Sequence, residues 1–306
     1  MIQLPLQEEL VLSSAKAWSN GRSLWADHRV IPMIPLLDND RLWKFWPDIK
    51  CDSIAVSYTD LIQNRPLYTR ARTLGIKEAL GFNGSVTSVL MGDNWLLDST
   101  SVEEYCEDVM RMGFDAATTS DDYVYTTDPE NYRWSRLHKV VDRARKMKAA
   151  NPSADLVGMA QGSRREEILF VLRTFNEIGI HRVAYPCAGY LSQRTLTPVR
   201  EFLKIGREFG MWLWLVGVNS IRTMQRLDAD ACSGKGWSYR ASQGAAYVNG
   251  SLRKTNLLHC THQLCRDYAK TWVEQSVRFA RHNILCLLDA DVRMRREHIG
   301  RAQVET

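Results

Sequence analysis

Short apolar runs separated by amphipathic segments recur along most of this chain. Runs that are continuously apolar, or that alternate apolar and polar positions, are typical of β-strands. The pattern predicts strands at residues 29–37, 53–58, 85–90, 115–120, 155–160, 182–186, 211–217 and 228–232.

Four of the segments between these runs show the apolar spacing of an amphipathic helix. They span residues 101–113, 131–150, 163–179 and 194–210. The first begins with Ser101 and Glu104, which have the spacing of a capping box. Three of the four end in a glycine just before the next strand, as expected of a helix C-cap.

Strands that alternate with helices over about 230 residues predict an α/β fold of the (β/α)8 TIM-barrel type. A doubly wound open sheet is the alternative. We assign residues 25–232 to the barrel core. After residue 232 the pattern changes to glycine, serine and aromatic residues. We therefore assign residues 233–306 to an appended C-terminal subdomain whose last helix packs back on the barrel.

Cysteine and histidine gather within this C-terminal part, in the stretch 259-HCTHQLC-265. A helix-like segment at 266–281 leads from it to another histidine. The spacing predicts a closed tetrahedral Cys2His2 site for a structural Zn2+, with no ligand position left for water. The expected ligands are Cys260, His262, Cys265 and His282, and His259 is a competing candidate.

The composition is typical of a globular protein, and the net charge is compatible with a polyanionic partner. Of the 306 residues 45% are hydrophobic, and the seven cysteines are an odd number that argues against a disulfide framework. The N-terminus lacks the pattern of a secretory signal, and no apolar run is long enough to span a membrane. We expect a cytoplasmic protein without membrane contact. The net charge of +5 permits a nucleic-acid partner.

Polar residues follow several of the predicted strands. In a (β/α)8 barrel the active site lies at the carboxyl ends of the strands. The residues expected there are Asp121 and Asp122 after the fourth strand, Gln161 and Gly162 after the fifth, Tyr185 and Cys187 after the sixth, Asn219 after the seventh, and Asp230 in the eighth. Carboxylates that converge on a pocket serve as nucleophile, general base or base-recognising acceptor, although a single aspartate also commonly caps a turn.

Several of these residues lie in motifs that occur in a fixed order along the chain. The motifs are 113-GFDAATTSDDYVY-125, 158-GMAQG-162, 216-VGVN-219, 228-DADAC-232, 260-CTHQLC-265 and 282-HNI-284. In content and order they resemble motifs of the tRNA-guanine transglycosylase superfamily, whose members exchange guanine in nucleic acid for a 7-deazaguanine base. The resemblance covers residues 50 to 285 or so.

The resemblance implies a role for each matching residue. Asp121 would read the purine, and Gln161 with Gly162 would bind the edge of the base. Asp230 would be the nucleophile that attacks C1′ of the sugar and forms a covalent glycosyl-enzyme. The Cys/His segment would hold the structural zinc.

The chain departs from the family pattern at the third strand. Val89 aligns with the aspartate that serves the family as general base, and an aliphatic side chain cannot take a proton. Asp93 lies four residues further on and is our candidate for this catalytic role, with Asp122 as its substitute.

The stretch 230-DACSGKGWSYRASQG-244 is most similar to the branch of the superfamily that inserts 7-deazaguanines of the 7-cyano type into DNA, a branch found in phages. Because a base within a duplex must be flipped out before it reacts, aromatic side chains are expected to hold it. The candidates for this are Tyr123, Trp237 and Tyr239, and Lys235 and Arg240 are candidates for binding phosphates.

Other functions remain open at this stage. The acceptor could be tRNA, which would make the protein a queuine or 7-deazaguanine tRNA-ribosyltransferase. It could also be a non-catalytic partner subunit of such an enzyme, or a barrel lyase or hydrolase unrelated to the family. A homodimer is a further possibility.

Overall fold

The chain forms a sheet of eight parallel strands that curls into a nearly closed barrel. The computed structural model describes residues 28–34, 48–49, 51–58, 76–82, 101–152, 154–255, 262, 265 and 275–304. The strands are β1 (Met33–Ile34), β2 (Ser53–Ser57), β3 (Glu78–Phe82), β4 (Ala116–Thr118), β5 (Leu156–Met159), β6 (Arg182–Pro186), β7 (Trp212–Val216) and β8 (Ala231–Ser233).

Backbone hydrogen bonds bring the first and last strands together. Cys232 on β8 donates to the carbonyl of Arg29 and accepts from the amide of Ile31, each at 2.9 Å. The strands follow one another in chain order around the sheet. A doubly wound sheet reverses its strand order partway, so this topology excludes that alternative. The predicted α/β class and (β/α)8 arrangement are confirmed.

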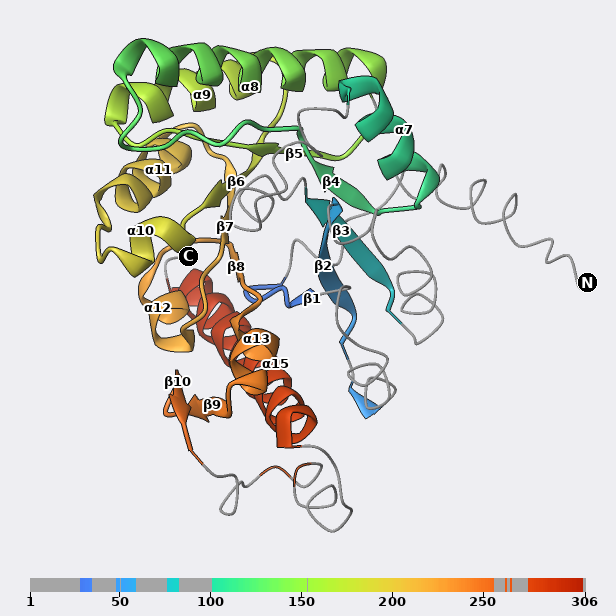
Figure 1. Cartoon of the computed structure of the whole chain (residues 1–306), viewed down its shortest axis with the longest axis vertical. Coiled ribbons are helices and arrows are strands. Elements are labelled where there is room, and N and C mark those ends of the chain that lie inside the picture. The colour runs from blue at the N-terminus through green and yellow to red at the C-terminus, as the bar shows by residue number, and fades with distance from the viewer. Residues whose placement is uncertain are drawn as a thin grey trace, which may run out of the picture.

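Helices lie outside the strands, between consecutive strands of the barrel (Figure 1). The described ones are α7 (Val102–Arg111), α8 (Glu130–Ala150), α9 (Arg165–Glu177), α10 (Ala188–Ser192), α11 (Thr197–Glu208) and α12 (Ile221–Arg226). The four helices predicted from apolar spacing correspond to α7, α8, α9 and α11. The short α10 lies in the connection between β6 and α11 and was not predicted.

Local sequence signals set the ends of these helices as expected. The amide of Ser101 donates to the Glu104 carboxylate at 2.8 Å, and the amide of Glu104 donates to the Ser101 hydroxyl at 3.0 Å. This is the reciprocal pair of a capping box. Gly179 follows α9 with a φ of 77°, a backbone conformation that glycine adopts without a steric penalty.

Large apolar side chains fill the interior of the barrel. They come from alternate positions of the strands and include Leu80, Met159, Val216 and the fully buried Trp214. A second apolar layer lies between the strands and the helices. The interior of the barrel is therefore a packed core that leaves no room for a ligand, and an active site is expected at the carboxyl ends of its strands.

Two strands lie elsewhere than the apolar runs indicated. The third strand is β3, whereas the predicted run 85–90 lies outside the described residues. The sequence 78-EALGF-82 has helix-forming residues, but backbone pairing with β2 and β4 on both sides makes it a strand. The eighth strand begins at Ala231, so most of the predicted run 228–232 precedes it.

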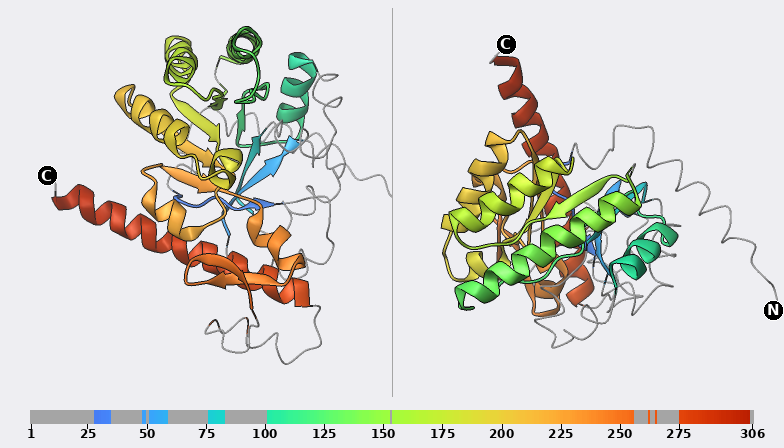
Figure 2. Two further views of the ribbon diagram at one scale, coloured as in Figure 1. Left: turned by 60° about the vertical axis from the view of Figure 1, so that its left-hand side comes forward. Right: turned by 90° about the horizontal axis from the view of Figure 1, so that it is seen from above.

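The chain after β8 forms a short helix, a hairpin and a long helix. These elements are α13 (Gly236–Ser242), the antiparallel pair β9 (Ala245–Val248) and β10 (Ser251–Lys254), and α15 (Gln275–Val304). In Figure 1 and in the left view of Figure 2, α15 lies on the opposite side of the strands from α8 and α9. The predicted domain division at residue 232 stays a prediction.

The last helix is longer than predicted and lies further along the chain. The segment 266–281 was expected to end before His282, but this histidine lies inside α15. Residues 266–274 lie outside the described part. No helix in the described part of the chain combines the length and apolar character needed to cross a bilayer.

Candidate functional site

Two buried polar side chains meet where β4 and β5 end. The amide nitrogen of Gln161 donates to the Asp121 carboxylate at 2.6 Å, and both side chains are only 2% exposed. Asp121 follows β4 by three residues and Gln161 follows β5 by two. The structure thus brings together the two residues predicted to recognise a base, at the carboxyl ends of the strands.

The loop after Gln161 is held rigidly by two tyrosines. The hydroxyls of Tyr185 and Tyr190 both donate to the carbonyl oxygen of Gly162. Burial raises the pKa of Tyr190 to about 12, and burial also raises the pKa of Tyr185, so both phenols remain protonated donors at neutral pH. Gly162 has a φ of 121°, which only glycine adopts readily.

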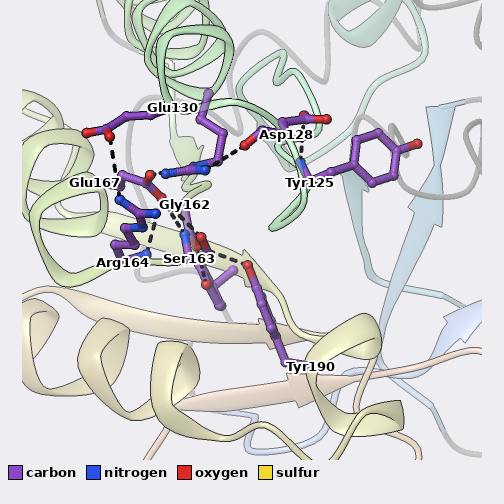
Figure 3. Close-up of polar contacts among 10 residues, drawn as sticks. Tyr125, Asp128, Glu130, Gly162, Ser163, Arg164, Glu167 and Tyr190 are labelled. Carbon is purple, nitrogen blue, oxygen red and sulfur yellow. Dashed lines mark hydrogen bonds and ion pairs between the residues drawn. The ribbon is translucent and has the colours of Figure 1, made fainter.

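An ion pair holds the other side of the same loop (Figure 3). The Glu167 carboxylate accepts from the backbone amides of Ser163 and Arg164, at 2.8 and 3.2 Å. Its second oxygen accepts from the Arg133 guanidinium on α8 at 2.7 Å. Because both charged groups are buried and hydrogen-bonded, the loop has little freedom, and the position of Gln161 is set in advance.

Asp122 and Tyr123 lie beside this pair but are not buried with it. The Asp122 carboxylate accepts from Arg136 at 2.7 Å. Tyr123 is half-buried and packs edge-on against Tyr125, with ring centroids 4.7 Å apart. Burial, and next the neighbouring Tyr125, raise the pKa of Tyr123. Tyr123 thus offers a protonated phenol and a partly exposed aromatic face at the rim.

Asp230 lies at the opposite end of the barrel from Asp121 and Gln161. It precedes β8, and its carboxylate accepts from the backbone amide of Leu213, near the start of β7, at 2.7 Å. The prediction that Asp230 lies at the carboxyl end of the eighth strand is therefore wrong. This position does not support a nucleophilic role, because the carboxylate pairs with Arg207 across the amino-terminal end of the strands.

The other predicted catalytic residue, Asp93, lies outside the described residues, as does Val89. The end of β3 nevertheless tests whether Val89 lies at the end of the third strand, as the family resemblance implied. Because β3 ends at Phe82, the residues that directly follow the strand are 83-NGS-85, and Val89 lies seven positions past its end. Placing Val89 at the end of the third strand was therefore wrong.

The residues after β8 that were predicted to hold a base or bind phosphates differ in their exposure. Trp237 is 1% exposed and its indole donates to the Met33 carbonyl at 2.9 Å, so it is a core residue and cannot hold a flipped base. Tyr239 is 63% exposed. Lys235 is half-buried, with its ammonium 5.9 Å from the centre of the Phe82 ring at the end of β3. Arg240 is exposed and donates to Gln243.

Three of the predicted metal ligands converge, from the 259–265 segment and α15. One ligand atom from each of His262, Cys265 and His282 lies within 4.8 Å of the others. The Cys265 thiol is 3.7 Å from Nδ1 of His282, and both residues are buried. A thiolate and two imidazoles are the donor set that a tetrahedral Zn2+ site uses. Cys260 lies outside the described residues.

Oxygen acceptors orient both histidines of this cluster. Nε2 of His262 is 2.7 Å from the Asp289 carboxylate, and Nε2 of His282 is 3.1 Å from the Tyr247 carbonyl. A histidine that donates from Nε2 presents the lone pair of Nδ1, as metal-bound histidines do. Burial lowers the pKa of His282, which favours this neutral form.

Sequence reasoning missed the residues that support these two sites. Neither Glu167 nor Arg133 was predicted to have a role. Glu167 is the third residue of α9, three after the N-cap Arg164, and a glutamate at that position is a local signal of a helix start. Asp289 lies seven residues after His282 on α15, so it was within reach of a helical-spacing argument. Tyr190 had no local signal, because it acts through a fold-dependent contact.

Comparison of the chain with protein-family models and with curated protein sequences finds no match. The fold and the two clusters define a class: a (β/α)8 barrel with a buried carboxylate–amide pair at the carboxyl ends of its strands and a His/Cys cluster beside its last helix.

Proposed function

We propose that this protein is a transglycosylase that exchanges guanine in nucleic acid for a 7-deazaguanine base. The observation that carries the proposal is the buried Asp121–Gln161 pair at the carboxyl ends of β4 and β5. The family resemblance of the surrounding motifs supports it. DNA is the proposed acceptor, from the similarity of residues 230–244 to the DNA-modifying branch, with tRNA as the alternative.

The pair has the chemistry to recognise a guanine edge. Guanine presents N–H donors at N1 and N2 and acceptors at O6 and N7. A carboxylate such as Asp121 accepts from the donors, while an amide such as Gln161 can also donate to an acceptor. Because the pair is buried and its loop is held from both sides, these side chains would lose little conformational entropy when a ligand binds.

The exchange would proceed in two displacements. A carboxylate oxygen bonds to C1′ as the C1′–N9 bond breaks, and the departing guanine takes up at N9 the proton of a second, protonated carboxyl group. The incoming 7-deazaguanine then gives its N9 proton back to that second carboxylate, and its N9 bonds to C1′ as the ester bond breaks. Since Asp230 lies at the wrong end, Asp93 and Asp122 are the proposed carboxylates.

We also propose that His262, Cys265 and His282, with Cys260, hold one structural Zn2+. When bound, the ion would cross-link the chain before α15 to α15 itself. Its four ligands would leave no position for a substrate. The zinc would therefore stabilise a C-terminal subdomain and take no part in the exchange.

One observation favours a second candidate, a non-catalytic partner subunit. The resemblance implies a carboxylate nucleophile, and the candidate that it gives for that role, Asp230, is engaged with Arg207 at the other end of the barrel from Asp121 and Gln161. Such a subunit would bind the base or the nucleic acid while an active partner performs the exchange.

The test is incorporation of labelled guanine and labelled 7-cyano-7-deazaguanine into duplex DNA and into tRNA. Wild-type protein is compared with the Asp121→Asn, Asp93→Ala and Asp230→Asn variants, and binding of the free base is measured in parallel by calorimetry. We expect label in DNA, lost with Asp121→Asn and Asp93→Ala but retained with Asp230→Asn.

Other outcomes separate the candidates. Base binding that depends on Asp121 without incorporation into either acceptor would support the partner subunit. Neither base binding nor incorporation, from folded protein that carries its metal, would refute both.

A further inference from the structure

A hollow with a basic rim runs along the outer wall of the barrel between α11 and α12. It measures about 480 Å³. We call it the basic groove and define it by Arg200, Lys204, Arg207 and Arg226, which line it together with Leu196, Leu203, Thr223, Leu227 and Asp228. It exists because α12 has six residues where α11 has twelve, so α12 covers only part of the wall beside α11.

The charges of α11 are sorted between its two sides. Glu201 points toward α9, where its carboxylate pairs with Arg165 at 2.6 Å. Arg200, Lys204 and Arg207 face the groove, at the spacing of three and four residues that places side chains on one helix face. Glu201 is therefore neutralised by a neighbouring helix, and the basic side of α11 is left to the groove.

Most of the positive charge of the groove is not matched within the protein. Asp228 is the one carboxylate among the described residues that line it. Arg200, Lys204 and Arg226 are exposed and form no ion pair with a described carboxylate. Three cations along one hollow repel one another, so the arrangement favours an anionic ligand that spans them.

Asp230 holds the fourth cation in place. Its carboxylate binds the Arg207 guanidinium at 2.7 Å, and the same guanidinium donates to the Asp228 carbonyl at 3.1 Å. Arg207 is still 37% exposed. Asp230 thus positions Arg207 at the end of the groove that lies on the amino-terminal side of the strands.

The groove extends along α11 toward the carboxyl side of the barrel, the side on which Asp121 and Gln161 lie. Leu196, which lines it, directly precedes α11 on the carboxyl side of the barrel, and Arg207 lies at the other end of the helix. A helix of this length extends about 18 Å. That length matches roughly five nucleotides of a strand at about 3.4 Å each.

We infer that the basic groove binds the phosphodiester backbone of the nucleic acid on one side of the reacting nucleotide. The inference rests on the proposed nucleic-acid substrate. Arg200, Lys204 and Arg226 would contact successive phosphates, and the partly exposed Leu196 would pack against a sugar.

The test is the salt dependence of binding, by fluorescence anisotropy, of labelled duplex DNA and labelled tRNA in separate arms. The groove variant carries Arg200→Ala, Lys204→Ala and Arg226→Ala. A matched control removes the same charge from exposed positions of α8 and α9, with Lys139→Ala, Lys146→Ala and Arg173→Ala. We expect the groove variant to bind at least one acceptor about tenfold more weakly, with a log–log salt slope shallower by about 0.9 per lost contact.

Equal losses of affinity in the groove and control variants would overturn the inference, because they would show that only the net charge of the protein matters. Binding of a polyglutamate peptide as tightly as DNA, abolished in the groove variant, would also overturn it and indicate an acidic protein partner. These outcomes are independent of the base-exchange assay, because free-base binding at Asp121 requires no backbone contact. The inference can therefore fail while the proposed function stands.

Discussion

Arg207 and Asp230 form an ion pair at the amino-terminal end of the barrel, with side-chain atoms 2.7 Å apart. The pair joins α11 to the residue just before β8. The Asp230 carboxylate also accepts from the Leu213 amide, so one side chain connects a helix and two strands. A carboxylate that sequence motifs assign to catalysis is, in the folded protein, a link in the wall of the barrel.

This relationship predicts a measurable coupling between the two residues. Each of Arg207→Ala and Asp230→Ala should lower the free energy of unfolding by about 1 kcal/mol, and the double variant should lose less than the sum by about 0.5 to 1 kcal/mol. Urea denaturation of the four proteins in the cycle measures this. Strict additivity would mean that the ion pair contributes nothing to stability.

Asp291 should contribute far more to stability than Glu297, which lies on the same helix. Its buried carboxylate accepts from the backbone amides of Arg29 and Val30 at 2.7 and 2.9 Å and contacts His28 at 2.8 Å. Asp291→Ala should cost about 2 to 3 kcal/mol, since it leaves the backbone amides of Arg29 and Val30 without their acceptor. The exposed Glu297→Ala on the same helix should change the unfolding free energy by less than about 0.5 kcal/mol. Similar values for the two variants would contradict the assigned role.

Glu167 should make stability depend on pH in the acid range. Burial acts to raise its pKa, but hydrogen bonds from Ser163, Arg133 and Arg164 outweigh burial, and the pKa lies below its usual value of 4.5. A carboxyl with a lowered folded-state pKa stabilises the protein above the unfolded-state pKa, and this contribution is lost as the pH falls through the folded-state pKa.

Glu167→Gln should therefore cost about 3 kcal/mol at pH 7, because it also leaves Arg133 buried without its partner. The difference from wild type should shrink as the pH falls below 4.5. Denaturant titrations at pH 7 and between pH 5 and pH 3 measure it, with the exposed Glu166→Gln as control. A difference that is constant over this range would contradict the pKa argument.

Removal of the metal should destabilise the C-terminal part of the chain. We expect one zinc per chain by elemental analysis, lost in Cys265→Ser, and a lower Tm in the presence of a chelator. Cys286 provides the control. Its thiol lies 3.4 Å from Nε2 of His282, on the side of the ring away from Cys265, so Cys286→Ser should retain the metal. Loss of zinc from both variants alike would show that Cys286 is also a ligand.

Sequence patterns by themselves determined the α/β class, the position of most strands and the ends of the helices. These depend on contacts between near neighbours, such as the Ser101–Glu104 capping box and the apolar run of β7. The sequence also predicted that Asp121 and Gln161 lie at the same end of the barrel, because both follow buried parallel strands whose carboxyl ends meet.

Only the tertiary structure decided which end of the barrel each polar residue occupies. A shift of two or three residues in a three-residue strand moves Asp230 from one end of β8 to the other, and no local signal sets that register. For the same reason β3 could not be found, because its residues favour a helix until β2 and β4 pair with it. The burial of Trp237 and the ion pair of Glu167 with Arg133 likewise depend on residues distant in the chain, and side-chain spacing alone cannot reveal them.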